Sequence, residues 1–158
     1  MLVQGKLLSY GDDLSEVFEI RRKVFQEEQG VSAELEFDEF DSIAVHVLVY
    51  EDLEQKKAVA TGRIIYNEDG CKIGRVAVLK EYRGHKYGDF VVRMLLGKAF
   101  TSGIHEVHLY SQLAAKGFYE KIGFSAVGEE FEEAGIKHIR MMIKEENLCF
   151  KCKMNAEN

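Results

Sequence analysis

The chain has 158 residues, about the length of one domain, and its 46% hydrophobic and 30% charged residues are typical of a globular protein. No apolar run approaches the roughly 18 residues of a membrane span, so we expect no transmembrane segment. The net charge of −6 argues against non-specific binding to nucleic acid or to an anionic membrane.

The N-terminal part of the chain predicts a strand and then a helix. Its first residues lack the basic start, apolar stretch and cleavage site of a secretory signal, and residues 2–9 form a plausible strand. Asp13, with Glu16 three residues later, resembles a capping box, and apolar residues continue at helical spacing to about Gln29. Residues 30–43 then form an acidic loop with room for a short helical turn.

The rest of the chain alternates between strand and helix patterns. Strands are predicted over residues 44–50, 59–66, 71–78, 107–111, 124–127 and 138–144. Asp69-Gly70 indicates a hairpin between two of them, and an acidic connection joins the last two. Helices are predicted over about 87–100 and 113–122. The order β-α-β-β-β-α-β-α-β-β predicts one α/β domain over residues 1–158, with a mixed central sheet flanked by helices.

The cysteines near the C-terminus form a lone CxxC pair, Cys149 and Cys152. With Cys71 they make no disulfide framework, and a structural zinc would need a second pair. We therefore expect no metal and a reduced, cytoplasmic protein. A redox or metal protein built on this pair is one alternative.

The most informative segment joins the strand that ends at Val76-Ala77-Val78 to the helix that begins near Tyr87. The connection holds Arg83, Gly84, His85, Lys86 and Gly88. A helix N-terminus attracts anions, glycine lets the backbone approach closely, and cationic side chains suit phosphate. The spacing is neither a dinucleotide fingerprint nor a Walker A loop. An ordinary solvated turn and a nucleotide-dependent enzyme are the other interpretations of this segment.

Two motifs resemble the GNAT N-acetyltransferases. Arg83-Gly84-His85-Lys86-Tyr87-Gly88 is similar to their pyrophosphate-binding motif, with Lys86 at a position where glycine is usual. The segment from Gln112 to Phe124, which contains Phe118-Tyr119-Glu120-Lys121, is similar to their later motif. Residues 22–31, 38–46 and 128–139 further resemble the bacterial ElaA/YjcF-like subgroup, so the resemblance extends over nearly the whole chain.

The resemblance implies transfer of an acetyl group from acetyl-CoA to a primary amine by direct attack on the thioester. In that family Val76, Ala77 and Val78 would pair with the pantetheine arm. The pyrophosphate would be held by Arg83, Gly84, His85, Lys86, Tyr87 and Gly88. Tyr119 would be the catalytic acid that protonates the departing sulfur, and Gln112 would contact the pantetheine amides or the acceptor. A non-catalytic acyl-CoA-binding sensor or scaffold of the same fold is the principal alternative.

The acceptor and the general base are less defined. Residues 26–55 contain ten acidic residues and no Lys or Arg, so the loop is expected to favour a small cationic acceptor. Acidic candidates for the base are Glu34, Glu36, Asp38 and Asp41. His46 and His108 lie in predicted strands, where packing is the more common role of a histidine, and water could also carry the proton. No pattern fixes the assembly, so a homodimer stays open.

Overall fold

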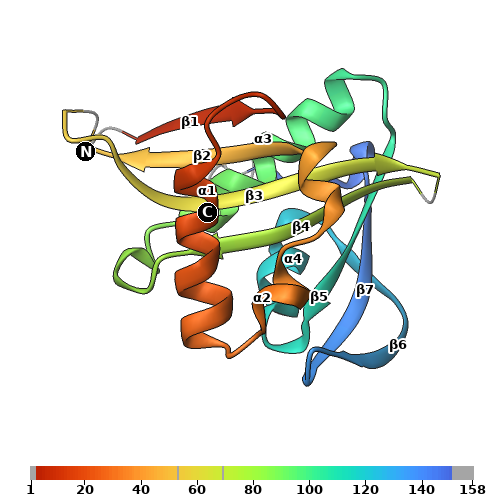
Figure 1. Cartoon of the computed structure of the whole chain (residues 1–158). Coiled ribbons are helices and arrows are strands. Elements are labelled where there is room, and N and C mark those ends of the chain that lie inside the picture. Colours follow the sequence, from red (N-terminus) through yellow and green to blue (C-terminus); the bar gives the residue numbers. More distant parts are fainter. Residues whose placement is uncertain (1–2, 53, 69, 151–158) are drawn as a thin grey trace.

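The computed structural model describes residues 3–52, 54–68 and 70–150, and a mixed sheet of seven strands forms its centre (Figure 1). The strands are β1 (Val3–Leu8), β2 (Val45–Glu51), β3 (Lys57–Asn67), β4 (Gly70–Val78), β5 (Glu106–Gln112), β6 (Ser125–Glu133) and β7 (Ile136–Lys144). Their spatial order is β1-β2-β3-β4-β5-β7-β6, and β4–β5 is the parallel pair among antiparallel neighbours. The predicted fold class and element order are confirmed.

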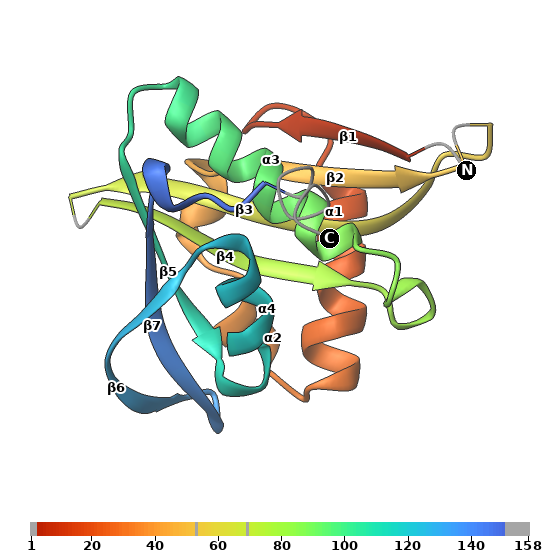
Figure 2. The same ribbon diagram turned by 180° about the vertical axis from the view of Figure 1, so that it is seen from behind.

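Helices cover both faces of this sheet. α1 (Ser15–Arg21) continues as a wider π-helical segment (Arg22–Glu28), and both lie on one face with α2 (Ala33–Glu36) (Figure 1). α3 (Tyr87–Thr101) and α4 (Lys116–Ile122) lie on the other face (Figure 2). The predicted capping box is wrong, because Leu14 occupies the cap position and the Asp13 carboxylate accepts a hydrogen bond from the Ser15 N–H instead.

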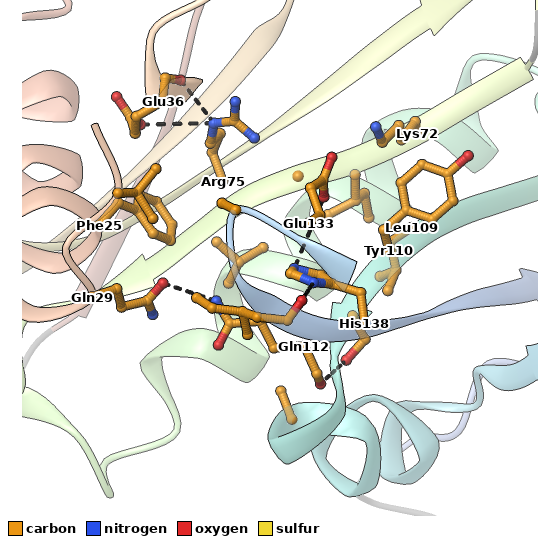
Figure 3. Close-up of a pocket in the computed structure, with 18 of the residues that line it drawn as sticks. Phe25, Gln29, Glu36, Lys72, Arg75, Leu109, Tyr110, Gln112, Glu133 and His138 are labelled. Atoms are coloured by element: carbon orange, nitrogen blue, oxygen red, sulfur yellow. Dashed lines mark hydrogen bonds and ion pairs between the residues drawn. The ribbon is translucent and has the colours of Figure 1, made fainter. Parts of the chain in front are cut away.

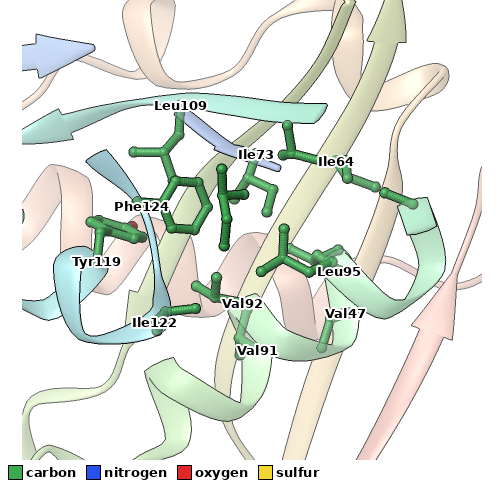
Figure 4. Close-up of a cluster of buried hydrophobic side chains, with 14 of the residues drawn as sticks. Val47, Ile64, Ile73, Val91, Val92, Leu95, Leu109, Tyr119, Ile122 and Phe124 are labelled. Carbon is green, nitrogen blue, oxygen red and sulfur yellow. The ribbon is translucent and has the colours of Figure 1, made fainter. Parts of the chain in front are cut away.

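The larger hydrophobic core lies between α3 and the sheet. Val91, Val92 and Leu95 are fully buried on one face of α3 against Ile64 and Ile73 (Figure 4). Burial of each such side chain stabilises the fold by about 1.5–3 kcal/mol, so this face fixes the helix and the loop that precedes it. A smaller core joins Val17, Ile20 and Val24 of the first helical segments to the opposite face.

The sheet opens between β4 and β5. These strands pair only where Cys71–Ile73 lies beside Val107–Leu109. One step further on, β4 carries a bulge, because Arg63 faces Gly74 and Thr61 faces Ala77, which leaves one extra residue on β4. Arg75 sits in this bulge with a φ of 54°. A bulge bends its strand, so β4 diverges from β5 and a gap opens in the middle of the sheet.

The C-terminal strands are longer than predicted. The acidic connection expected between them is itself strand, because β6 runs to Glu133 and β7 starts at Ile136. Ala134 and Gly135 both have positive φ, as a two-residue hairpin turn requires. The acidic residues of β6 lie on the exposed outer strand of the sheet, where charge is well tolerated.

Two of the predicted motifs include positions that the structure does not describe. Asp69 of the predicted hairpin and Cys152 of the CxxC pair lie outside the described residues. Cys71 is buried in the larger core. Within the described part of the chain, no helix has the length and apolar character needed to cross a membrane.

Candidate active site

A cavity of about 300 Å³ occupies the gap between β4 and β5 (Figure 3). Apolar side chains that line it are Phe25, Val31, Ile73, Val76, Leu109 and Ile136. They come from the π-helical segment, the loop after it, both diverging strands and the β6–β7 hairpin. The cavity therefore depends on tertiary packing of segments from the whole chain.

Three of the predicted site residues, Val76, Gln112 and Tyr119, line this cavity. Val76 follows the bulge of β4, and Gln112 ends β5. Ala77 packs instead in the smaller core on the other face, and the Val78 carbonyl accepts a hydrogen bond from Arg83 Nε at 3.0 Å.

Tyr119 is held by aromatic neighbours. It is 9% exposed, and its ring makes edge-to-face contacts with Phe118 and Phe124 at centroid distances of 4.9 and 5.6 Å. Burial raises the pKa of the Tyr119 hydroxyl above its usual range, because the charged phenolate is disfavoured away from water. The side chain thus keeps its proton and presents a hydroxyl donor in a fixed place.

Gln112 closes one side of the cavity. Its Nε2 donates a hydrogen bond to Oε1 of Gln29 at 2.9 Å, which ties the end of β5 to the residue after the π-helical segment (Figure 3). In the sheet, Gln112 lies opposite His138 of β7. The polar side chains of Gln112 and Gln29 therefore border the apolar lining of the cavity.

The predicted phosphate loop lies at the N-terminus of α3. Gly84 and Lys86 have positive φ angles of 85° and 66°, and these turn the chain into the helix. Gly88 is buried in the first helical turn, whose N–H groups lack partners inside the helix. His85 stacks on Tyr87 at 5.8 Å beside a second cavity of about 380 Å³.

Two side chains of this loop are already engaged. Arg83 forms hydrogen bonds with both carboxylate oxygens of Glu28 at 2.8 and 3.0 Å, which anchors the loop to the first helical region. The Tyr87 hydroxyl donates a hydrogen bond to Glu51, and this bond together with burial raises the pKa of Tyr87 to about 12. Each terminal nitrogen of Arg83 keeps one further N–H, so direct phosphate binding would use those two donors.

Lys86 adopts a left-handed conformation, which glycine reaches without steric cost. For a residue with a side chain, this conformation destabilises the folded state by about 1–2 kcal/mol, and glycine would remove that cost. Glycine also raises the conformational entropy of the unfolded chain, which lowers stability by about 0.4–1 kcal/mol. Lys86→Gly is therefore expected to raise the free energy of unfolding by about 0.5–1 kcal/mol, measured by urea denaturation. Lys86→Ala removes the same charge but keeps the strain. An equal gain in both variants would contradict this explanation.

The acidic loop is neutralised inside the protein. Arg21 binds Glu36 at 2.5 Å and Asp41 at 2.7 Å, and Arg63 binds both Asp38 and Asp41 at 2.7 Å. Burial disfavours the charged carboxylates, but hydrogen bonds and charge from the arginines prevail and lower the pKa of both aspartates.

The expectation that this loop attracts a cation therefore loses its basis at Glu36, Asp38 and Asp41, because arginines from three other elements occupy them. The side chain of Glu34 lies outside the described residues. Arg75, from the bulge of β4, adds hydrogen bonds to the Glu36 carbonyl at 3.0 Å and to Asp38 at 3.2 Å. This network fixes the loop beside the cavity.

The two histidines considered as bases do not line the cavity. His46 is fully buried, its Nε2 lies 3.1 Å from the Asp41 carbonyl, and burial lowers its pKa. His108 is buried on β5 and contacts the edge of Tyr110. Both are packed strand residues, as the sequence pattern favours.

Sequence reasoning missed several polar residues of the cavity. His138 and Glu133 enter from the β6–β7 hairpin, and Lys72 lies over the Tyr110 ring with Nζ 4.4 Å from its centroid. Burial lowers the pKa of Lys72. The strand pairing of His138 with Gln112 is the signal that would have found the histidine, and only the sheet register reveals it.

The fold matches that of an acyl-CoA N-acyltransferase from Pseudomonas aeruginosa, whose crystal structure superimposes with a TM-score of 0.79 at 25% identity, covering 90% of this chain and 99% of that one. The family described as "Acetyltransferase (GNAT) domain" matches residues 14–145, and the chain belongs to this family. It is thus an acetyltransferase by family, and the predicted resemblance is confirmed.

Relatives and solved structures match most of the chain. The chain is 41% identical over 141 residues to "Uncharacterized protein YyaT" of Bacillus subtilis, covering 82% of this chain and 87% of that protein. It is 35% identical over 132 residues to "Uncharacterized N-acetyltransferase YjcF" of Bacillus subtilis, covering 83% and 92%. The crystal structure of Escherichia coli ElaA superimposes with a TM-score of 0.79 at 27% identity, covering 90% of this chain and all (100%) of that one.

Proposed function

We propose that this acetyltransferase moves an acetyl group from acetyl-CoA to the primary amine of a small molecule, by direct attack of the amine on the thioester. The observation that carries the proposal is the meeting of Val76, Gln112 and Tyr119 around one cavity in the open part of the sheet. Gln112 and Tyr119 belong to the second motif, and Val76 lies on the strand that precedes the first. The cavity volume of about 300 Å³ suits a small acceptor better than a protein segment.

In this proposal, acyl-CoA extends from the cavity along the edge of β4 to the loop that precedes α3. The edge of β4 at Val76–Val78 faces the gap and offers backbone groups to the pantetheine amides. The loop from Arg83 to Gly88 leads to the N-terminus of α3, where helix N–H groups favour the pyrophosphate. At the other end Tyr119 donates its proton to the departing sulfur.

The acceptor would arrive as an ammonium ion, because primary amines are mostly protonated near neutral pH. Glu133 supports a cationic acceptor better than the acidic loop does, since its side chain is 61% exposed and it lies at the cavity. We further propose a single domain over residues 1–158 in the cytoplasm, without a metal.

Thermal denaturation tests the cosubstrate. Acetyl-CoA at 100 times its dissociation constant should stabilise the fold by about 2.7 kcal/mol, which is a shift of several degrees for a domain of this size. ATP with Mg²⁺ and NAD serve as controls and should give no shift. CoA release is then measured with a panel of primary amines. Binding without release for any amine would favour the sensor alternative, and a shift with ATP alone would refute the proposal.

A further inference from the structure

We propose that His138 is the general base of this reaction and that its Nε2 removes the proton from the acceptor ammonium. This inference rests on the proposed function. His138 lies on β7, lines the same cavity as Tyr119 and Val76, and stands in register with Gln112 at the end of β5. Its side chain is 11% exposed, so the ring is mostly buried while it still lines the cavity.

Hydrogen bonding fixes which ring nitrogen can act as the base. Nδ1 of His138 lies 2.7 Å from the carbonyl oxygen of Ile136. A carbonyl can only accept, so Nδ1 carries the proton of the neutral ring and Nε2 keeps a free electron pair. The ring also stacks on Phe131 at 5.7 Å and 25°, which holds its plane. These contacts give the His138 ring one tautomer and one orientation.

Glu133 completes the arrangement as a positioning residue. Its Oε2 lies 3.9 Å from Nε2 of His138 (Figure 3). When Nε2 takes a proton, the imidazolium gains a favourable interaction with this carboxylate. Charged or titratable groups that line the cavity with His138 are Glu133, Lys72, Arg75, Glu36, Tyr110 and Tyr119. Of the acids, Glu36 is bound to Arg21, which leaves Glu133 as the competing base.

The proton transfers balance as follows. Nε2 takes one proton from the ammonium, and the freed nitrogen lone pair attacks the thioester carbonyl carbon. The carbon–sulfur bond then breaks and the sulfur takes a proton from Tyr119, whose oxygen regains one from the new amide nitrogen. The imidazolium finally loses its proton to water. The sum is ammonium plus thioester giving amide, thiol and one proton.

Two nearly isosteric amines test this step. Ethylamine is protonated at neutral pH, whereas the fluorines of 2,2,2-trifluoroethylamine leave its nitrogen largely unprotonated. His138→Asn keeps a side-chain N–H for the Ile136 carbonyl but has no base nitrogen. The variant is expected to release CoA about 100-fold more slowly with ethylamine and less than about 10-fold more slowly with the fluorinated amine. The thermal shift with acetyl-CoA should match that of the parent.

His105→Asn is the matched control, because His105 is 86% exposed and outside the cavity; it should leave both rates unchanged. Equal losses with both amines, or no loss in His138→Asn, would overturn the proposal. A loss with ethylamine in Glu133→Gln but not in His138→Asn would assign the base to Glu133 instead. Nitrogen-15 NMR of the imidazole tests the tautomer without any acceptor, and a proton on Nε2 in the neutral ring would refute the assignment. Acetyl-CoA binding without turnover of any amine would count against the proposed function alone.

Discussion

Arg21→Met is expected to lower the free energy of unfolding by about 3–5 kcal/mol. Arg21 is fully buried and binds Glu36 and Asp41, so its loss leaves Glu36 without its closest cation and Asp41 with one of its two arginines. The guanidinium also lies over the rings of Phe18 and Phe37 at 5.3 and 5.5 Å, and methionine would keep only part of that packing. Urea denaturation at pH 7 measures the difference.

Arg22→Met is the control, because Arg22 is the next residue and binds Glu19 and Glu27 at the exposed surface. Surface ion pairs contribute little to stability, so the free energy of unfolding of this variant should stay close to that of the parent. The effect at Arg21 should also shrink in acid. The lowered pKa of Asp41 means that its stabilisation is complete above the ordinary aspartate value of about 4 and is lost as pH falls through the lowered value. Similar losses in both variants would contradict a buried network.

Tyr119→Phe is expected to reduce kcat by about 100-fold, while the KM for acetyl-CoA and the melting temperature stay close to those of the parent. Phenylalanine keeps the contacts with Phe118 and Phe124 and removes only the hydroxyl that protonates the sulfur. A buried tyrosine used only for packing would show no change in kcat. Steady-state CoA release with the best amine of the panel gives the comparison.

Tyr66→Phe is the matched control, because it removes the hydroxyl of a tyrosine that lies outside the cavity. Tyr66 lies on β3, packs against the same core and does not line the cavity. Its variant should keep the parent kcat. If both variants lose activity equally, the effect at Tyr119 comes from the core, and if neither does, Tyr119 is not the acid.

The order of strands and helices could be predicted because each has a clear local pattern. Helix α3 shows buried residues at Val91, Val92 and Leu95, and the valines of β2 are equally distinct. The strand prediction for β6 ended at Val127, and its acidic remainder was expected to be a connection, because those residues lie on an exposed outer strand where composition resembles that of a loop. Local sequence patterns therefore predicted the buried elements better than the outer strand β6.

The site was predictable only where a continuous motif encodes it. The loop around Lys86 and the helix of Tyr119 are such motifs. The neutralised acidic loop was not predictable, because the arginines that bind it come from α1, β3 and β4. His138 reaches Gln112 only through the pairing of β5 with β7. These relations depend on tertiary structure, which one sequence does not display.

The gap between β4 and β5 also determines where the sheet places its open strand edges. A strand edge with open backbone groups is normally a template for another chain and a source of aggregation. Here such edges lie in the middle of the sheet rather than at its margin. Phe25 and Gln29 border them on one side and the β6–β7 hairpin on the other, so a foreign strand has no straight approach. The fold can thus leave unpaired backbone groups accessible to a small ligand but not to a strand of another protein.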